Sequence, residues 1–464
     1  MSNTSWEYVP TPHFERTPLR LLAPIRAPDS SAKRRNLPSP PYPPTTPPQN
    51  VPYVVTTHVI PAALPRASPN VPLPTAASQA TTKDQRREAN AKTFEEISKT
   101  WRKRVSGELG NEGSEKEMVN VVNRYVHRDI LEAGTSKHPR GRGVTLMFAH
   151  ANGFPKEIWE PTIQRLLASS QTAEIVDEVW VWEAVQHGDS YLLNAAALDG
   201  VFSWHDNARD ITNFLLHYLP SMPGGTLPTH LDAVSSSEST QRHTRGFNHR
   251  TFVVTGHSYG GCSSAFAALT FPALFDAIIF VDPVIVMPGR YKSTDDKYAN
   301  ALVRGAISRR DEWASREEAF NSFQSSPFFK VWHPSVVRTY CDRGIHHPAG
   351  EKGPAKLKMP GVQEAIVFVD TTTPTEVFQL LPMLDKRIEL RWVMPGRVDN
   401  SEIGGPGHGN ILCWRRPENS SNVRISKAGH LITQEAPHEL ADEIDAFLGR
   451  KYGSSSGNVT QARL

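Results

Sequence analysis

Cysteine, long apolar runs and net charge are all scarce in this sequence of 464 residues. The three cysteines, Cys262, Cys341 and Cys413, lie far apart and form neither a Cys-x-x-Cys pair nor an even-numbered set. Zinc sites and disulfide frameworks need closely spaced or paired cysteines, so neither is expected, and the pattern is typical of a reducing compartment.

No stretch approaches the roughly 18 apolar residues that span a bilayer, and the N-terminus has no basic start followed by an apolar core. We therefore expect neither a membrane span nor a secretory signal. The formal charge of +3 is small for this length, and the basic residues are spread along the chain rather than gathered in one stripe. Nucleic acid is accordingly not an expected partner.

Proline, by contrast, is abundant, and eighteen of the 38 prolines precede residue 80. Proline has no backbone N–H donor and favours extended conformations, so a segment dense in proline has little capacity to form regular structure. This composition predicts a disordered Pro-rich leader over residues 1–85 and one globular domain over residues 86–464.

Beyond about residue 115, short apolar runs alternate with helical patterns. Continuous apolar strands separated by helices are typical of a parallel sheet that is buried on both faces. The pattern therefore predicts an α/β fold with a mostly parallel central sheet and flanking helices. The expected strands cover residues 119–126, 144–149, 179–182, 251–254, 277–281 and 388–393.

Two segments interrupt this alternation. Residues 220–249 are rich in Ser, Thr, Gly and His, which predicts an inserted surface loop. Residues 284–350 contain helical patterns without a clear strand, and we expect a helical cap over the C-terminal edge of the sheet. The cap's large aromatics would form either an acyl-binding pocket or simple core: Trp313, Phe320, Phe323, Phe328, Phe329 and Trp332.

A serine lies between an expected strand and an expected helix. Ser258 is central in the motif Gly-His-Ser-Tyr-Gly over residues 256–260, and the small residues that follow begin a helix. Glycines two positions on either side let strand and helix approach closely around a sharp turn. The context predicts that Ser258 is a nucleophile at such an elbow.

A serine hydroxyl needs a base and a carboxylate that orients the base. His430 follows an expected strand at 423–425 and precedes an amphipathic helix, as the general base of this arrangement does. Asp399 is the first choice for the acid because it lies in the loop after the strand at 388–393, which gives the chain order Ser, Asp, His that is typical of the fold. Asp282 is the alternative, since it directly follows the strand at 277–281 and can reach the same imidazole.

The negative charge of a tetrahedral intermediate needs two backbone N–H donors aimed at one point. Tyr259, the residue after the nucleophile, is expected to supply one. Asn152, in the loop after the strand at 144–149, is expected to supply the other, with Gly153 as the alternative.

Four motifs together resemble fungal α/β-hydrolases of the toxin-biosynthesis and peroxisomal-lipase type, over roughly residues 115–450. They are the serine motif, His-Ala-Asn-Gly-Phe-Pro at 150–155, Gln-His-Gly-Asp-Ser at 186–190 and Ser-Trp-His-Asp-Asn-Ala-Arg-Asp at 203–210. The resemblance implies an α/β-hydrolase fold and a lipase- or esterase-like enzyme of peroxisomes with a Ser, His and Asp triad. The last two motifs are expected only to shape the wall of the site.

The expected reaction is cleavage of a small-molecule carboxylic ester through an acyl-enzyme, without a metal or an organic cofactor. One alternative is an acyl-CoA thioesterase or acyltransferase of fungal secondary metabolism. Another is a non-catalytic lipid-binding protein, and a third treats the leader as a docking module.

The last residues, Ala462, Arg463 and Leu464, follow a Gly- and Ser-rich stretch within an expected flexible tail over 452–464. They preserve the small, basic, leucine pattern of a Ser-Lys-Leu peroxisomal address. This predicts a peroxisomal import receptor as partner and the peroxisome as location, with the cytoplasm as the alternative.

Overall fold

The structure is a computed structural model. It describes residues 3–28, 37–46, 52–75, 82–110, 112–134, 136, 143–290, 297–348, 350, 353–397 and 402–453.

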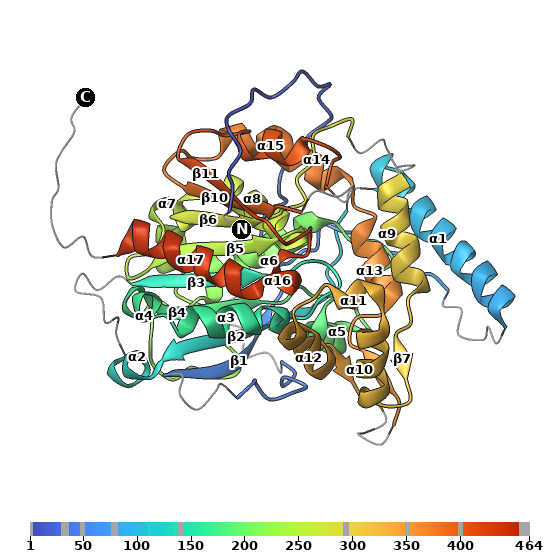
Figure 1. The fold of residues 1–464 in the computed structure, drawn as a ribbon, viewed down its shortest axis with the longest axis horizontal. Helices are drawn as coiled ribbons and strands as arrows, with labels where there is room; N and C mark the ends of the chain where they lie inside the picture. The colour runs from blue at the N-terminus through green and yellow to red at the C-terminus, as the bar shows by residue number, and fades with distance from the viewer. Residues whose placement is uncertain are drawn as a thin grey trace.

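The apolar runs form one eight-stranded sheet with the order β1-β2-β4-β3-β5-β6-β10-β11 (Figure 1). β2 pairs antiparallel with both β1 and β4, and every other neighbouring pair is parallel. The predicted α/β-hydrolase fold with a mostly parallel sheet is therefore confirmed. The strands are β1 (Tyr53–Pro61), β2 (Val119–His127), β3 (Val144–Ala149), β4 (Val176–Trp182), β5 (Thr251–His257), β6 (Ala277–Val281), β10 (Glu389–Pro395) and β11 (Ser420–Ile425).

Helices cover both faces of the sheet. Successive strand residues point to opposite sides, so each strand contributes apolar side chains to both faces. In β3, Leu146 and Phe148 belong to one apolar core, and Met147 and Ala149 belong to the other. The first core is completed by α3 (Glu160–Leu167), α4 (Ser170–Ile175) and α17 (Pro437–Tyr452), and the second by α6 (Trp204–Asn213), α8 (Tyr259–Thr270) and α14 (Thr372–Leu380).

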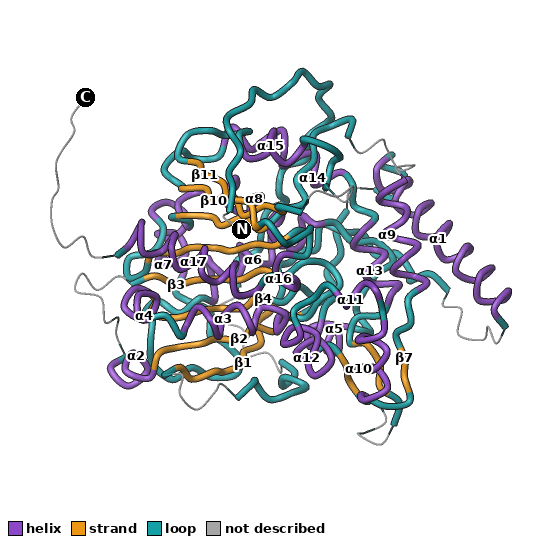
Figure 2. The backbone as a smooth tube through the Cα atoms, in the orientation of Figure 1, coloured by secondary structure: helices purple, strands orange, loops and turns teal. Residues whose placement is uncertain are grey.

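The cap between β6 and β10 differs from the prediction in two respects. It contains a small antiparallel sheet of order β7-β9-β8 among its helices (Figure 2), and it continues beyond residue 350. Strands of two or three residues are too short to leave a period-two pattern in the sequence. The elements are α9 (Lys297–Ser308), β7 (Glu312–Trp313), α10 (Arg316–Ser325), α11 (Pro327–Lys330), α12 (Pro334–Arg343), β8 (Ile345–His346), β9 (Ala355–Leu357) and α13 (Gly361–Phe368).

The segment at 220–249, expected to be a loop, contains the helix α7 (Ser236–Arg245). Ser235 accepts a hydrogen bond from the backbone N–H of Glu238, which caps the first turn. Arg242 is the buried residue of α7, so the helix leaves no apolar stripe that the sequence would reveal. The remaining short helices are α2 (Arg128–Ala133), α5 (Gly188–Asn194), α15 (His408–Cys413) and α16 (Ile432–Glu435).

The described parts of residues 1–85 also differ from the expected disorder. The nine residues of β1 pair with β2, because β-branched side chains fill the strand and its one proline, Pro61, is its last residue. Nearer the N-terminus, the carbonyl of Thr4 accepts from the N–H of Arg424 in β11, and Arg20 pairs with Glu376 of α14. The Pro-rich composition concealed these attachments to the fold.

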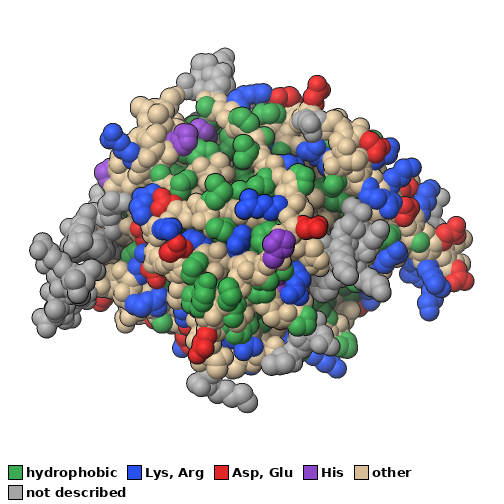
Figure 3. All heavy atoms as spheres, turned by 90° about the horizontal axis from the view of Figure 1, so that it is seen from above, with side chains coloured by type: hydrophobic (Ala, Val, Ile, Leu, Met, Phe, Trp, Pro, Cys, Tyr) green, Lys and Arg blue, Asp and Glu red, His purple; other side chains and the backbone are tan. Residues whose placement is uncertain are grey.

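The helix α1 (Lys83–Val105) projects at one end of the molecule (Figure 1). Its apolar residues Phe94, Ile97 and Trp101 are buried, and the helix contacts α9 of the cap. Side chains of both charge signs are visible on the outer part of this end (Figure 3). No helix in the described ranges is long and apolar enough to cross a membrane.

Candidate active site

Ser258 lies at the sharp turn between β5 and α8, with φ 55° and ψ −118°. This positive φ is rare for a non-glycine residue and costs about 1–3 kcal/mol. Two hydrogen bonds hold the turn against β6: the N–H of Ser258 donates to Val281 O, and the N–H of Val284 donates to Ser258 O, each at 3.1 Å.

The flanking glycines allow the close approach that the turn requires. A Cβ on Gly260 would lie 2.5 Å from the carbonyl oxygen of Ala149, and one on Gly256 would lie 2.6 Å from the Cα of Gly261. A real Cβ does not lie this close to another heavy atom, so only glycine fits at these two positions. The motif that suggested the elbow is therefore dictated by backbone packing between β3, β5 and α8.

His430 lies in the loop between β11 and α16 and meets Ser258 across the edge of the sheet. Its Nε2 is 3.1 Å from Ser258 Oγ, within hydrogen-bond distance. Its Nδ1 is 2.6 Å from Oδ2 of Asp282. The serine, histidine and aspartate therefore form one continuous line of hydrogen bonds.

The carboxylate that meets His430 is thus Asp282, which the sequence placed second. Asp399, the first choice, lies outside the described residues. Asp282 directly follows β6, the neighbour of the serine-bearing β5, and its N–H donates to Val393 O of β10 at 3.0 Å. A residue one position beyond β6 consequently lies at the same sheet edge as Ser258.

His257 is a further residue of the site, and sequence reasoning did not single it out. Its Nε2 is 2.9 Å from the carbonyl oxygen of His430, and its Nδ1 is 3.2 Å from Thr433 Oγ1. A carbonyl can only accept, so Nε2 carries the proton and Nδ1 accepts from the threonine hydroxyl. Burial and the adjacent His430 lower the pKa of His257 to about 3, which keeps the ring neutral.

The loop after β3 is held from two sides. Asn152 donates through Nδ2 to the carbonyl of Glu364 in α13 at 3.1 Å, while its Oδ1 lies 3.0 Å from Nε2 of His187. The N–H of Gly153 donates to the same Nε2 at 3.1 Å. One ring nitrogen either donates or accepts, so His187 Nε2 serves one of these two groups at a time, and the backbone N–H groups of Asn152 and Gly153 both stay candidate donors. The turn that carries His187 therefore fixes this loop.

A cavity of about 710 Å³ opens on Ser258 and His430. Asn152 and Tyr259 line it beside Ser258, so both candidate backbone donors belong to the same space. The opposite wall comes from the cap and is mainly aromatic and aliphatic. Its members include Trp313, Phe323, Phe328, Phe329, Tyr340 and Leu357.

The six aromatics singled out in the cap divide between pocket and core. Four of them line the cavity, and two of these four, Trp313 and Phe323, also belong to the apolar core that buries Trp332. Phe320 packs against that core. The cap also brings one ion pair to the cavity wall, between Arg309 of the α9–β7 connection and Glu364. Burial raises the pKa of Glu364, and Arg309 opposes this shift.

Relatives similar to this chain in sequence include a yeast protein and a Penicillium protein. The peroxisomal membrane protein LPX1 of Saccharomyces cerevisiae is 24% identical over 315 residues, which cover 65% of this chain and 74% of that protein. The type I acyl-CoA thioesterase mpaH of Penicillium roqueforti is 27% identical over 344 residues, covering 69% of this chain and 71% of the relative. The resemblance drawn from the motifs is confirmed.

Among solved structures, the peroxisomal alpha-beta-hydrolase Lpx1 of Saccharomyces cerevisiae superposes with a TM-score of 0.60 at 18% identity, covering 90% of this chain and 94% of that chain. At this identity the likeness shows a shared fold. The model of the alpha/beta hydrolase family matches residues 146–443, which include most of β3, the elbow and the His430 loop. This chain is therefore an enzyme of the alpha/beta hydrolase family.

Proposed function

We propose that the enzyme is a serine hydrolase that cleaves carboxylic esters through an acyl-enzyme. Ser258 is the nucleophile, His430 the general base and Asp282 the carboxylate that orients the base. The supporting observation is the line of hydrogen bonds from Ser258 Oγ to His430 Nε2 at 3.1 Å and from His430 Nδ1 to Asp282 at 2.6 Å. The line ends at a cavity large enough for a substrate.

In the first half of the cycle, His430 Nε2 takes the hydroxyl proton as Ser258 Oγ bonds to the ester carbonyl carbon. The backbone N–H groups of Tyr259 and Asn152 donate to the carbonyl oxygen as it becomes negative. Asp282 stabilises the imidazolium, which then protonates the departing alcohol as the ester bond breaks.

In the second half, a water molecule gives its proton to His430 and attacks the acyl carbon. The resulting intermediate collapses, the proton returns to Ser258, and the carboxylic acid leaves. His257 supports both halves as a positioning residue, because its N–H holds the carbonyl of His430 and thereby the orientation of the imidazole.

The acyl group of the substrate is proposed to occupy the cap side of the cavity. The aromatic wall formed by Phe323, Phe328 and Phe329 offers apolar surface and has room for a bulky or extended acyl group. The volume of about 710 Å³ lies in the usual range for small-molecule sites, about 300–1,000 Å³.

A fluorophosphonate probe tests the nucleophile directly, because it reacts only with an activated serine. We expect the wild-type protein to be labelled on Ser258 and the Ser258→Ala protein to stay unlabelled. Ser263, on the same helix α8 and fully buried, supplies a matched control as Ser263→Ala. Equal labelling of wild type and Ser258→Ala would refute the assignment.

A thioester is the second candidate for the scissile bond, because the Penicillium roqueforti relative is titled an acyl-CoA thioesterase. Parallel assays with p-nitrophenyl esters and acyl-CoA thioesters of graded chain length separate the two, with Ser258→Ala as the blank. A lipid-binding protein without activity would retain fatty acid and turn over neither substrate.

We also propose that the enzyme acts in peroxisomes, addressed by Ala462, Arg463 and Leu464. These residues lie outside the described part of the chain, and the proposal is supported by their pattern and by a relative titled peroxisomal. Removing Leu464 from a tagged protein should shift it from peroxisomes to the cytosol. Unchanged peroxisomal fluorescence would contradict the address.

A further inference from the structure

The N-terminal segment over residues 3–8 lies against the edge strand β11. The carbonyl of Thr4 accepts from the N–H of Arg424 at 2.7 Å. The N–H of Trp6 donates to Asn422 Oδ1 at 2.7 Å, and Asn422 Nδ2 donates to the carbonyl of Trp6 at 3.0 Å. This paired contact fixes the backbone on either side of the Trp6 ring.

The Trp6 ring is itself held between β11 and α15. The guanidinium of Arg424 lies over the ring, 4.8 Å from its centroid. At the edge of the six-membered ring, a Cβ on Gly409 would lie 2.8 Å from Cη2 of Trp6, so the absent side chain leaves the space that Trp6 occupies. Glu402 accepts from the N–H of Gly409 at 2.7 Å, which holds this part of α15 in place.

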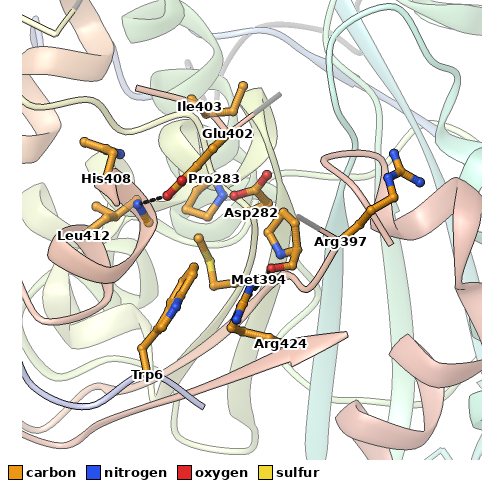
Figure 4. A pocket seen from close by; sticks show the side chains of 12 residues that line it. Trp6, Asp282, Pro283, Met394, Arg397, Glu402, Ile403, His408, Leu412 and Arg424 are labelled. Atoms are coloured by element: carbon orange, nitrogen blue, oxygen red, sulfur yellow. Dashed lines mark hydrogen bonds between the residues drawn. The ribbon is translucent and has the colours of Figure 1, made fainter. Parts of the chain in front are cut away.

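Trp6 and Asp282 line the same small cavity, of about 100 Å³ (Figure 4). This cavity borders the substrate cavity around Ser258, since Arg397 and Ile403 line both, and Asp282 lines the smaller one. Its apolar lining includes Pro283, Met394 and Leu412. The charged and titratable groups that share it with Asp282 are Arg397, Glu402, His408 and Arg424.

The access of water to this cavity affects the hydrogen bond between Asp282, the proposed acid, and His430. The side chain of Asp282 is 6% exposed, and its Oδ2 is engaged by His430. A hydrogen bond between charged partners strengthens as the surrounding dielectric falls and weakens when water reaches it. Whatever closes the outer wall of the cavity therefore influences how firmly Asp282 holds the imidazole.

We propose that Trp6 is a positioning residue that closes this cavity and keeps bulk water from the Asp282–His430 hydrogen bond. The inference rests on the proposed function, because it assigns a catalytic purpose to that hydrogen bond. It gives the docked part of the Pro-rich leader a role in the active site. Trp6 reaches no substrate and acts only through Asp282.

The experiment compares Trp6→Ala with Trp6→Phe and Tyr8→Ala in the full-length protein. Tyr8 belongs to the same segment and contacts Trp414, but it is 61% exposed and is not among the residues that line the cavity. We expect Trp6→Ala to lower kcat about tenfold with little change in KM. Trp6→Phe should restore most of the loss, and Tyr8→Ala should behave as wild type.

A second readout does not depend on turnover. The proton between His430 Nδ1 and Asp282 should give a low-field ¹H NMR resonance in wild type that is absent from Asp282→Asn. In Trp6→Ala we expect exchange with water to broaden or remove this resonance. Asn422→Ala, which releases the Trp6 backbone and keeps the indole, should produce the same change if Trp6→Ala does not fold.

The outcomes separate this inference from the proposed function. Wild-type kcat and an unchanged resonance in Trp6→Ala would overturn the proposal that Trp6 closes the cavity. An equal loss of kcat in Tyr8→Ala would overturn it as well. Wild-type protein that hydrolyses neither esters nor thioesters would instead overturn the proposed function. The resonance would still decide whether Trp6 shields the Asp282–His430 pair.

Discussion

Ser258 and Asp282 flank the same imidazole in very different surroundings. The serine faces a cavity of about 710 Å³ walled by the cap, whereas the aspartate faces one of about 100 Å³ walled by β10, α15 and Trp6. The difference suits their proposed tasks, because a nucleophile must admit substrate and water while a carboxylate that orients a base works best away from solvent. The side of His430 that faces Ser258 (the open side) and the side that faces Asp282 (the closed side) can therefore be perturbed separately.

The largest effect is expected on the open side. Ser258→Ala removes the proposed nucleophile and His430→Gln removes the proposed base, so each should lower kcat by roughly 10⁵–10⁶. The double variant should be no slower than either single one, because the two side chains act as a unit. Ester hydrolysis by the purified variants measures this, and additive losses would contradict a shared step.

His257 contacts the backbone of His430 itself, and its replacement should give the next largest loss of kcat. His257→Leu leaves the carbonyl of His430 without its buried donor, and we expect kcat to fall about ten- to a hundredfold. His257→Gln offers an amide N–H in a similar place and should recover part of the loss. Equal kcat for the Leu and Gln variants would show that the ring only fills space.

A smaller change is expected where the cap is proposed to hold the acyl group. Phe328 lines the large cavity and is 53% exposed, so Phe328→Ala removes about half a ring of apolar contact. KM for long-chain p-nitrophenyl esters should rise about fivefold, with short-chain esters nearly unaffected. Phe320→Ala, in the same cap and away from the cavity lining, is the control. A rise in KM that is equal for all chain lengths would argue against an acyl pocket.

The smallest effect concerns stability on the closed side. Burial and nearby Arg290 lower the pKa of His408 to about 4, below its ordinary value of about 6.5. The unfolded chain therefore binds a proton first, and this residue's contribution to stability is lost as pH falls from about 6.5 towards 4. Replacing it by Gln should flatten the plot of unfolding free energy against pH by up to about 1.4 kcal/mol per unit in that window.

Urea unfolding of wild type and His408→Gln at several pH values measures this slope, since the other groups titrate alike in both proteins. The amide oxygen of glutamine can accept the N–H of Met287 that His408 Nε2 accepts at 3.1 Å. An identical slope in both proteins would show that His408 binds a proton as readily in the folded state as in the unfolded state.

The same contrast explains what the sequence could predict. Ser258 is marked by its own neighbours, because the glycines around it are needed for the close approach of β3, β5 and α8. His430 could be found from its place after an expected strand. The structure brings these two residues within 3.1 Å, and both were named from local patterns.

Asp282 and His257 could not be ranked in that way, because their roles depend on which strands are neighbours. Asp282 reaches His430 since β6 lies beside β5, and strand order is not visible in a single sequence. His257 acts through a carbonyl 173 positions away in the chain. The two- and three-residue strands of the cap were missed because they are too short for a periodic pattern. The strand β1 of the leader was missed because the Pro-rich composition around it predicts disorder.

The assignment of Asp282 as the acid is tested most directly by comparing kcat of Asp282→Asn with that of Asp399→Asn in folded, full-length protein. Asp282→Asn should lose about 10⁴-fold, because an amide no longer stabilises the imidazolium. Asp399→Asn should stay within about twofold of wild type, because Asp282 is proposed to supply the carboxylate that holds His430. Near-normal activity in Asp282→Asn with a large loss in Asp399→Asn would contradict the account and move the acid to the other loop.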